Sequence, residues 1–362
     1  MGIKHEDVKA SQDKGYASEW NKNHIIDGDV DYNQYSNTDF VIENRTDFPA
    51  GPVDGQVIFR TDLNGFYVWN GTAWKTWGNI ATILVAADGS GDYTDIQSGI
   101  NALPATGGIV YIKEGSYNII AQIDLNIANI TLMGAGRATI IQDTVNVTIL
   151  SATAANSADN CIIQDLKIIG VGGAGQYGIY LETDNCIVKN CWIQDVARGI
   201  YSDGGENNII DGNYMTNCQS GVFFAAGESG LFTSNVMDSC GEGISIVTTP
   251  KCIAKGNICK NGDFGIVTSS EYNSVVGNIC IDNTNDGIQM QLDTDNNVIS
   301  SNVCTGNGGI GIWIRNGCLN NVVMSNHCTG NTGGSITDSG TNTLPNGATG
   351  TTNLQLDDLN YI

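Results

Sequence analysis

Two carboxylates, Glu182 and Asp203, lie 21 residues apart and close two similar segments, Gly-Ile-Tyr-Leu-Glu and Gly-Ile-Tyr-Ser-Asp. Alternation along a strand places each carboxylate on the same side as the tyrosine two residues before it, Tyr180 or Tyr201. If the two strands are neighbours, their backbones are about 4.8 Å apart, which is compatible with the roughly 5 Å carboxyl spacing of a retaining glycosidase. The pair therefore predicts acid–base chemistry with Glu182 and Asp203 as catalytic residues.

An aromatic column accompanies the carboxylates. Tyr180, Tyr201 and Phe223 occupy the same place in successive segments, and Trp313 takes it further along the chain. Aromatic faces stack on sugar rings and also make protein contacts. These four residues are therefore candidate ligand-binding residues, and catalysis, binding of a glycan or protein, and an ordinary acidic surface all stay open.

The segments belong to a repeat that must position these side chains. A glycine followed by Ile or Val recurs seven times with spacings of 21 to 24 residues, and a period in this range is typical of a solenoid. The pairs are Gly178-Ile179, Gly199-Ile200, Gly221-Val222, Gly243-Ile244, Gly265-Ile266, Gly287-Ile288 and Gly311-Ile312.

Each repeat contains short β-branched or alternating runs between Gly, Asn, Asp and Ser, and none shows a helical apolar period. About 22 residues suit three short strands and three turns. The pattern predicts an all-β chain, a right-handed single-stranded parallel β-helix, in which equivalent residues of successive coils stack.

A column of asparagines runs in phase with the glycines, and we expect it at turns that need left-handed backbone geometry. Its members are Asn190, Asn213, Asn235, Asn257, Asn278, Asn302 and Asn326. The second residue after each asparagine is expected to point inward. That predicted interior column is Trp192, Met215, Met237, Cys259, Cys280, Cys304 and Cys328.

Composition narrows the chemistry of the chain. Its 362 residues carry a net charge of −22, which argues against nucleic acid and anionic membranes as partners. The cysteines number 11, an odd count, and several fall in the inward column, so we expect free buried thiols rather than a disulfide framework. Zinc-ligand spacings are missing, and we expect no resident cofactor apart from a possible calcium ion.

Residues 1–45 form a polar leader with scattered aromatic residues, which we expect to become ordered only against a partner chain. Asp27, Asp29 and Asp31 alternate within it and could hold calcium, although a solvated acidic loop is the favoured explanation because no twelfth-position acid follows. The start of the chain has no apolar signal segment, and no long apolar span follows, so we expect neither a signal peptide nor membrane insertion.

Residues 46–79 predict a small β-meander, since Asn64-Gly65 and Asn70-Gly71 separate three aromatic-rich runs. The stretch from Ala50 to Trp77, with Gly-Gln-Val-Ile-Phe-Arg-Thr-Asp and Tyr-Val-Trp-Asn-Gly-Thr-Ala-Trp, resembles a β-module of viral tail-fibre and tail-spike proteins. That resemblance implies a virion or extracellular location and contact with other tail proteins through the leader. The leader and the Trp-rich module cannot bury their own apolar surface, so we also expect a homotrimer with parallel axes.

Residues 80–340 contain the β-helix, and 341–362 a tail or cap. Thr94 to Gln97 forms a capping box, and Ile96, Ile100 and Leu103 share one face of a short helix that would cover the open end of the core. This entry, with the Gly108 to Tyr117 stretch after it, resembles the pectate-lyase-like β-helix superfamily. The resemblance implies the fold and leaves the chemistry open.

Two enzyme families with this fold can be compared by residue. Asn283-Thr284-Asn285-Asp286-Gly287 is similar to the Asn-Thr-Asp-Gly stretch of polygalacturonases, but their paired Asp-Asp, Gly-His-Gly and Arg-x-Lys elements have no counterpart. A pectate-lyase mechanism needs calcium and a basic groove, which the few Arg and Lys residues do not supply.

The sequence therefore favours a virion tail fibre or spike that binds a host-surface glycan or protein. One alternative is a polysaccharide-degrading glycoside hydrolase or lyase on the same β-helix, and another is a structural rod without a ligand. Whether the chain is an enzyme stays undecided here, with the balance on the side of a binding protein.

Overall fold

The computed structural model describes residues 42–61, 65–76, 82–341 and 343. The chain divides into two compact units, Met1–Asn79 and Ile80–Ile362. Asp27, Asp29 and Asp31, the calcium candidates, lie outside the described residues, as do most of the expected leader and tail.

The first unit is a four-stranded sheet made of β1 (Glu43–Arg45), β2 (Val57–Arg60), β3 (Gly65–Trp69) and β4 (Trp74–Thr76). β2, β3 and β4 pair antiparallel, which confirms the meander, and β1 adds a parallel strand that the sequence did not suggest. Asn70 closes the last turn because its Oδ1 accepts from the backbone of Thr72 and Ala73. The ring of Phe48 stacks on Trp74 with centroids 5.5 Å apart.

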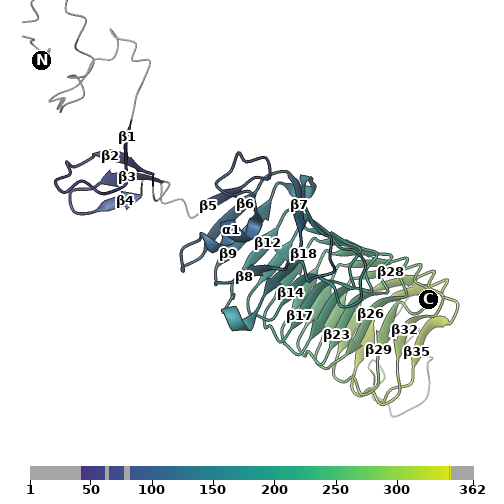
Figure 1. Ribbon diagram of the computed structural model, residues 1–362. Helices are drawn as coiled ribbons and strands as arrows, with labels where there is room; N and C mark the ends of the chain where they lie inside the picture. Colours follow the sequence, from purple (N-terminus) through teal and green to yellow (C-terminus); the bar gives the residue numbers. More distant parts are fainter. Residues whose placement is uncertain (1–41, 62–64, 77–81, 342, 344–362) are drawn as a thin grey trace, which may run out of the picture. The chain divides into compact units, whose positions relative to one another are not determined.

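The second unit is a right-handed parallel β-helix whose coils stack in register, as the repeat predicts (Figure 1). Three parallel sheets run along it, which we name sheets I, II and III. Sheet I contains β5 (Thr82–Val85), β6 (Gly108–Ile112), β9 (Ile130–Gly134), β12 (Ile162–Gln164), β15 (Ile187–Lys189), β18 (Ile209–Asp211), β21 (Leu231–Thr233), β24 (Ile253–Lys255), β27 (Ser274–Val276), β30 (Val298–Ser300) and β33 (Val322–Met324).

Sheets II and III follow sheet I in each coil. Sheet II contains β7 (Gly115–Ile119), β10 (Thr139–Asp143), β13 (Lys167–Ile169), β16 (Trp192–Gln194), β19 (Tyr214–Thr216), β22 (Val236–Asp238), β25 (Ile258–Lys260), β28 (Ile279–Ile281), β31 (Val303–Thr305) and β34 (His327–Thr329). Sheet III contains β8 (Ile123–Leu125), β11 (Leu150–Ala152), β14 (Tyr177–Leu181), β17 (Arg198–Asp203), β20 (Ser220–Ala225), β23 (Glu242–Val247), β26 (Phe264–Ser269), β29 (Ile288–Met290), β32 (Ile310–Ile314) and β35 (Gly334–Asp338).

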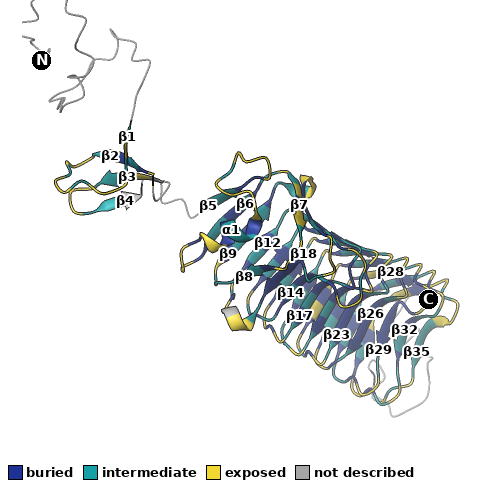
Figure 2. Ribbon diagram, viewed as in Figure 1, coloured by how far each residue is buried: buried dark blue, intermediate teal, exposed yellow. Residues whose placement is uncertain are grey.

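The core is a continuous apolar column inside the three sheets, and Figure 2 shows buried strands joined by exposed turns. The glycine that precedes each inward Ile is required by close packing rather than by left-handed geometry. A Cβ on Gly243 would lie 2.5 Å from the carbonyl oxygen of Gly265 and 2.6 Å from Sγ of Cys259. The glycines therefore let sheet III approach the inward residues of sheet II.

Buried asparagines form a hydrogen-bonded ladder at the turn between sheets I and II. In each step an Oδ1 accepts from the backbone N–H and the side-chain amide of the asparagine one coil earlier, as Asn257 does for Asn235 at 3.0 Å each. The left-handed residue is the one before the ladder, such as Gly256 with φ +66°. The asparagines thus satisfy buried polar groups. The expectation that they themselves adopt left-handed geometry holds for Asn190, with φ +54°, and is wrong for the other members of the predicted column.

The ladder also corrects the predicted interior column. Cys191, not Asn190, occupies the ladder position, since its N–H donates to Oδ1 of Asn213 at 2.9 Å. Ile193 therefore points inward beside Met215, and Trp192 points outward, where its ring stacks on Tyr214 at 3.9 Å. A slip of one residue moves a side chain to the opposite face of a strand.

A short helix, α1 (Ile96–Asn101), packs its buried Ile96 and Ile100 into the first coils. Its N-cap is Asp95, whose carboxylate accepts from the N–H of Ser98 at 2.8 Å, so the expected cap at Thr94 is displaced by one residue. Two 3-10 turns, η3 (Gly136–Ala138) and η4 (Ala154–Asn156), interrupt the early coils.

All 11 cysteines are buried and free, as expected. Cys259, Cys280, Cys304 and Cys328 stack in register on neighbouring strands of sheet II. They act as small apolar filler of the core.

Candidate functional site

The outer face of sheet III carries the residues that the sequence singled out. Figure 1 shows its strands β14, β17, β23, β26, β29 and β32 side by side along one flank of the solenoid. The outward side chains form three columns that run along the coils, which we call the inner, middle and outer columns in chain order. The middle column is Tyr180, Tyr201, Phe223, Ser245, Val267, Gln289 and Trp313.

Tyr180 joins the two carboxylates. Its hydroxyl donates to Oε1 of Glu182 at 2.6 Å and lies 3.5 Å from Oδ2 of Asp203. These two carboxylate oxygens are therefore no more than about 6 Å apart, the sum of the two distances. The structure thus brings Glu182 and Asp203 together on neighbouring coils, where both are half-buried.

An aromatic cluster surrounds the pair. The ring of Tyr201 lies 5.2 Å from Tyr180, 5.4 Å from Phe223 and 4.9 Å from Tyr177 between centroids. Tyr177 stands in the inner column, one position before the repeated glycine, so sequence analysis that began at the glycine missed it. The rings and carboxylates together make a surface with both apolar faces and acid groups.

Arg198 is a second residue that the sequence analysis overlooked. It pairs with Tyr177 in the inner column, and its guanidinium lies over Phe223 at 3.7 Å and over Tyr201 at 4.3 Å. In the part of the chain that the structure describes, this guanidinium forms no hydrogen bond or ion pair with another side chain. Ring contacts hold it, and its N–H donors stay available.

The surroundings of the tyrosines keep them protonated. Burial raises the pKa of Tyr180 well above its ordinary range, and the hydrogen bond to Glu182 adds to that effect. Burial first and the bond to Asp203 second raise the pKa of Tyr201 to about 12. Both phenols are therefore hydrogen-bond donors at neutral pH.

Trp313 lies in the same column but not in the same cluster. Five coils separate it from Tyr201, and its indole contacts Arg315, whose guanidinium carbon lies 4.5 Å from the ring centre. Of the four aromatic candidates, the structure therefore groups Tyr180, Tyr201 and Phe223 with the carboxylates and leaves Trp313 apart.

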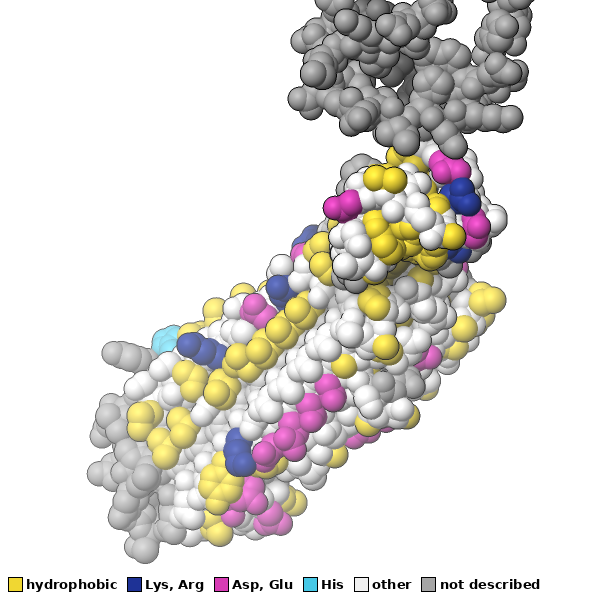
Figure 3. All heavy atoms as spheres, turned by 90° about the vertical axis from the view of Figure 1, so that its left-hand side faces the viewer, with side chains coloured by type: hydrophobic (Ala, Val, Ile, Leu, Met, Phe, Trp, Pro, Cys, Tyr) yellow, Lys and Arg dark blue, Asp and Glu magenta, His cyan; other side chains and the backbone are white. Residues whose placement is uncertain are grey.

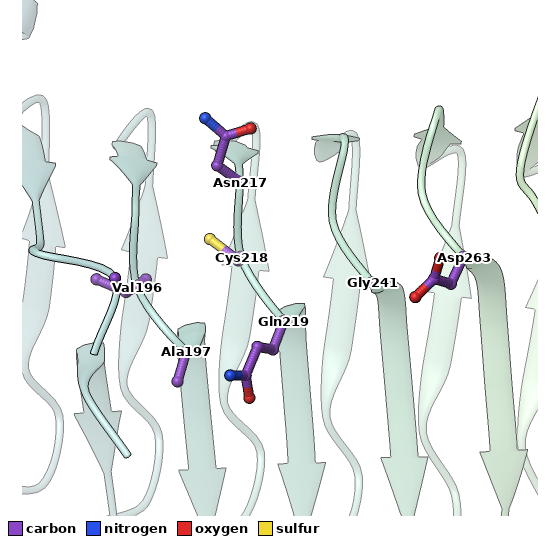
Figure 4. Close-up of a pocket in the computed structure, with 8 residues that line it drawn as sticks. Val196, Ala197, Asn217, Cys218, Gln219, Gly241 and Asp263 are labelled. Atoms are coloured by element: carbon purple, nitrogen blue, oxygen red, sulfur yellow. The ribbon is translucent and has the colours of Figure 1, made fainter. Parts of the chain in front are cut away.

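An open hollow of about 390 Å³ borders the face at the turns that lead into sheet III (Figure 4). It is lined by Ala197, Gln219 and Asp263, among others, which directly precede the inner-column residues of their coils. In Figure 4 the carboxylate of Asp263 points toward Gly241. The hollow thus adds polar groups beside the column that contains Arg198.

The outer face of sheet I carries a row of aliphatic side chains. Figure 3 shows a row of hydrophobic side chains running beside a row of acidic ones. The outward residues of sheet I form an aliphatic row, and acidic residues stand at the turn before it. The aliphatic row is Ile162, Ile187, Ile209, Leu231 and Ile253, and the acidic residues include Asp184, Glu206 and Glu228.

Metal ligands do not gather in the described ranges, where no three His, Cys, Asp or Glu side chains are placed to hold an ion. The same ranges contain no helix with the length and apolar character that a membrane span needs. The possible calcium ion at Asp27, Asp29 and Asp31 stays a prediction because those residues are not described.

Two family models match parts of the chain. The pectinesterase model matches residues 82–210, and the model of the periplasmic copper-binding protein NosD matches residues 187–346. The first match contains the cluster residues from Tyr177 to Asp203 but not Phe223. Each model covers less than half of the chain.

Curated relatives agree with the first match. Probable pectinesterase 56 of Arabidopsis thaliana is 31% identical over 137 residues, which are 34% of this chain and 48% of that protein. Pectinesterase 2 of Citrus sinensis is 37% identical over 106 residues, which are 27% of this chain and 20% of that protein. The chain thus spans less than half the length of these relatives.

Solved structures share the fold. The enzymatically active domain of tailspike protein 2 of bacteriophage CBA120 has a TM-score of 0.57 at 13% identity, over 81% of this chain and 51% of that one. The A-module of the mannuronan C-5 epimerase AlgE4 of Azotobacter vinelandii has a TM-score of 0.54 at 16% identity, over 68% of this chain and 77% of that one.

These comparisons correct the expected function. The expectation of a receptor-binding tail fibre or spike is wrong, because the two curated relatives described above are pectinesterases and the segment matched by the pectinesterase model contains the carboxylate pair. The alternative of a carbohydrate-active enzyme fits better. The homotrimer, the partners and the extracellular location were not tested and stay predictions.

Proposed function

We propose that the chain is a hydrolase that acts on a polysaccharide, with the face of sheet III around Tyr180 as its active site. One observation carries this proposal. The hydroxyl of Tyr180 contacts both Glu182 and Asp203, and the three residues lie inside the segment that matches the pectinesterase model.

Ester hydrolysis is the reaction that we favour. One carboxylate would accept a proton from the water that attacks the ester carbonyl, and the other group, in its protonated carboxylic acid form, would give its proton to the departing alkoxide. Tyr180 would fix the orientation of Glu182 through its 2.6 Å hydrogen bond. The guanidinium of Arg198 would donate to the carbonyl oxygen as negative charge develops on it.

Sugar binding would come from the rings. Tyr201 and Phe223 offer apolar surface to the less polar face of a sugar unit, while Arg198 lies over both rings and presents donors to its oxygens. The reacting bond would then lie beside Glu182 and Asp203, because the outer column is adjacent to the middle one.

Glycoside hydrolysis is the second candidate, and the spacing of the carboxylates favours it. Their oxygens are at most about 6 Å apart, whereas retaining glycosidases have carboxyl groups about 5–5.5 Å apart and inverting enzymes about 6.5–9.5 Å. The geometry would therefore give retention of configuration, as the sequence suggested.

Methyl-esterified pectin distinguishes the two reactions when released methanol and new reducing ends are both measured. We expect Glu182→Gln and Asp203→Asn each to lower the rate by about 100-fold or more, while Glu206→Gln, an exposed turn acid, serves as the matched control. Methanol without reducing ends indicates an esterase, and reducing ends without an unsaturated sugar product indicate a glycosidase rather than a lyase. Turnover that survives both substitutions would show that the site lies elsewhere.

A further inference from the structure

We infer that the outer face of sheet III holds a second sugar-binding subsite at Trp313 and Arg315, which takes a distant unit of the same polysaccharide. This inference rests on the proposed function, because it assumes that a polysaccharide lies along this face. It adds a subsite that the carboxylate cluster does not contain.

The register fixes the relation between the two places. Tyr201, Phe223, Ser245, Val267, Gln289 and Trp313 pair in succession, so Trp313 stands in line with Tyr201 along the solenoid. Five coil steps of about 4.8 Å place the two rings about 24 Å apart. A linear polysaccharide of several units could contact both.

The chemistry at Trp313 suits a sugar. The indole is half-buried, and Arg315 lies over its ring at 4.5 Å. Within the described ranges the Arg315 guanidinium forms no hydrogen bond or ion pair with another side chain, and the buried indole N–H of Trp313 has no acceptor. A sugar offers an apolar ring face to the indole and oxygen acceptors to the guanidinium of Arg315.

Gln289 and Asp286 support the subsite from the preceding coil. Oδ1 of Asp286 accepts from the N–H of Ile310 at 2.7 Å, and Oδ2 accepts from Nε2 of Gln289 at 2.7 Å. Both side chains are nearly buried, at 5% exposure. This arrangement fixes the Gln289 amide beside Trp313, and no described residue donates to its carbonyl oxygen, which can accept from a sugar hydroxyl.

The two ends of the face repeat one combination of groups. At the first end Arg198 lies over Tyr201 and Phe223, and at the second Arg315 lies over Trp313. In both places a guanidinium rests on a ring without an acidic partner in the described structure. Such a pair binds a sugar unit through its ring face and through a carboxylate or hydroxyl oxygen.

The path between the ends is open to a chain. The middle and outer columns contain only small or uncharged side chains between Asp203 and Arg315. Those between Phe223 and Gln289 are Ala225, Ser245, Val247, Val267 and Ser269. These two columns therefore contain no acidic side chain between Asp203 and Arg315, whereas the inner column beside them holds the half-buried Glu242.

Trp313→Ala tests the subsite with oligogalacturonides of two lengths, in free-acid and methyl-esterified forms. We expect KM for a long oligomer to rise about two- to tenfold with kcat unchanged, because ring stacking is lost. A trimer, too short to reach Trp313 from the carboxylates, should show unchanged KM. Trp313→Phe should restore most of the loss, and Leu292→Ala, an exposed residue of the preceding coil, is the matched control.

Arg315→Gln shows whether the guanidinium of Arg315 binds a sugar carboxylate or sugar hydroxyl oxygens. If Arg315 binds a carboxylate, the variant should weaken binding of the free-acid long oligomer and leave its methyl-esterified form unchanged. If it binds hydroxyl oxygens, both forms should bind more weakly. Unchanged binding of both forms would remove Arg315 from the subsite.

A direct measurement of binding tests this inference separately from the proposed function. Affinity electrophoresis in a pectin gel detects binding without turnover, so loss of retention in Trp313→Ala would support the subsite even if no hydrolysis occurred. Turnover that depends on Glu182, together with an unchanged long-oligomer KM in Trp313→Ala, would overturn the subsite alone. Dissociation of an oligomer by Trp313→Ala in light scattering would instead make this surface a contact between copies and also overturn it.

Discussion

Tyr180 and Glu182 form a 2.6 Å hydrogen bond across the outer face of one strand, and the same hydroxyl reaches toward Asp203 on the next coil. We expect Tyr180→Phe to lower kcat on pectin about 10- to 100-fold, since a hydrogen bond to a charged group contributes about 1.5–3 kcal/mol. The substitution keeps the ring, so the midpoint of thermal unfolding should change little. Tyr177→Phe is the matched control, because its ring belongs to the same cluster and its hydroxyl makes no hydrogen bond to a described residue.

Alkaline pH should destabilise the fold through the same tyrosines. Burial and the hydrogen bond to Asp203 raise the pKa of Tyr201 to about 12, whereas an unfolded tyrosine ionises near pH 10. The folded state therefore retains a proton that the unfolded state loses, and the free energy of unfolding falls as pH rises from about 10 to 12. Denaturant unfolding across this window measures the slope, which should be shallower in Tyr201→Phe. An equal slope in wild type and variant would contradict the assignment.

Two buried serines of sheet III should respond in opposite ways. Ser151 is 1% exposed, and its hydroxyl has no partner among the described residues, whereas Ser202 is fully buried and accepts from the amide of Asn208 at 3.1 Å. Ser151→Ala removes an unsatisfied group and should be neutral or stabilising, but Ser202→Ala should cost about 1–3 kcal/mol because it leaves a buried donor unpaired. Urea denaturation of both variants measures the difference.

The asparagine ladder should be sensitive to loss of one member. Asn257→Ala would remove the acceptor of two donors on Asn235 and leave them buried. Because each unsatisfied group costs about 1–3 kcal/mol, we expect the free energy of unfolding to fall by about 2 kcal/mol or more. Asn316→Ala, at an exposed turn, should change it by less than about 0.5 kcal/mol. Similar losses in both variants would show that the ladder adds nothing specific.

The stacked thiols should be unreactive in the native protein. Cys259, Cys280, Cys304 and Cys328 are fully buried, and burial raises the pKa of the Cys259 thiol well above its ordinary value. A thiol reagent should therefore label none of the four until denaturant is added. Rapid native labelling of all four would mean that the coils open readily in solution.

The sequence predicted the solenoid because every coil must meet the same packing and hydrogen-bonding requirements. Each coil must supply a glycine where sheets II and III approach closely and an asparagine where buried donors need an acceptor, so Gly243 and Asn257 are read directly from their columns. The sequence also predicted an outward face with Tyr180, Glu182, Tyr201 and Asp203, because successive side chains of a strand alternate between its two sides.

The remaining features of the fold and the site depend on side-chain contacts that the repeat pattern of the sequence does not show. Asn190 looks like a ladder member, but Cys191 holds that position, and only the hydrogen bond to Asn213 decides the register. Arg198 occurs once at its place in the repeat, so its role appears only when the rings of Tyr201 and Phe223 are seen beneath it. The expected function was wrong because the resemblance of a module in the first 79 residues to tail proteins was given more weight than the carboxylate pair. How close the two carboxylates lie depends on side-chain geometry, which the sequence does not show.

In-register stacking has a consequence for how such a chain can change. Every coil presents the same columns, so a whole coil could be inserted or deleted between Phe223 and Gln289 without altering the groups on either side. Such an event would move Trp313 toward or away from the carboxylates by one step of about 4.8 Å. The solenoid would then act as a ruler, in which the number of coils sets the length of polymer that can touch both ends.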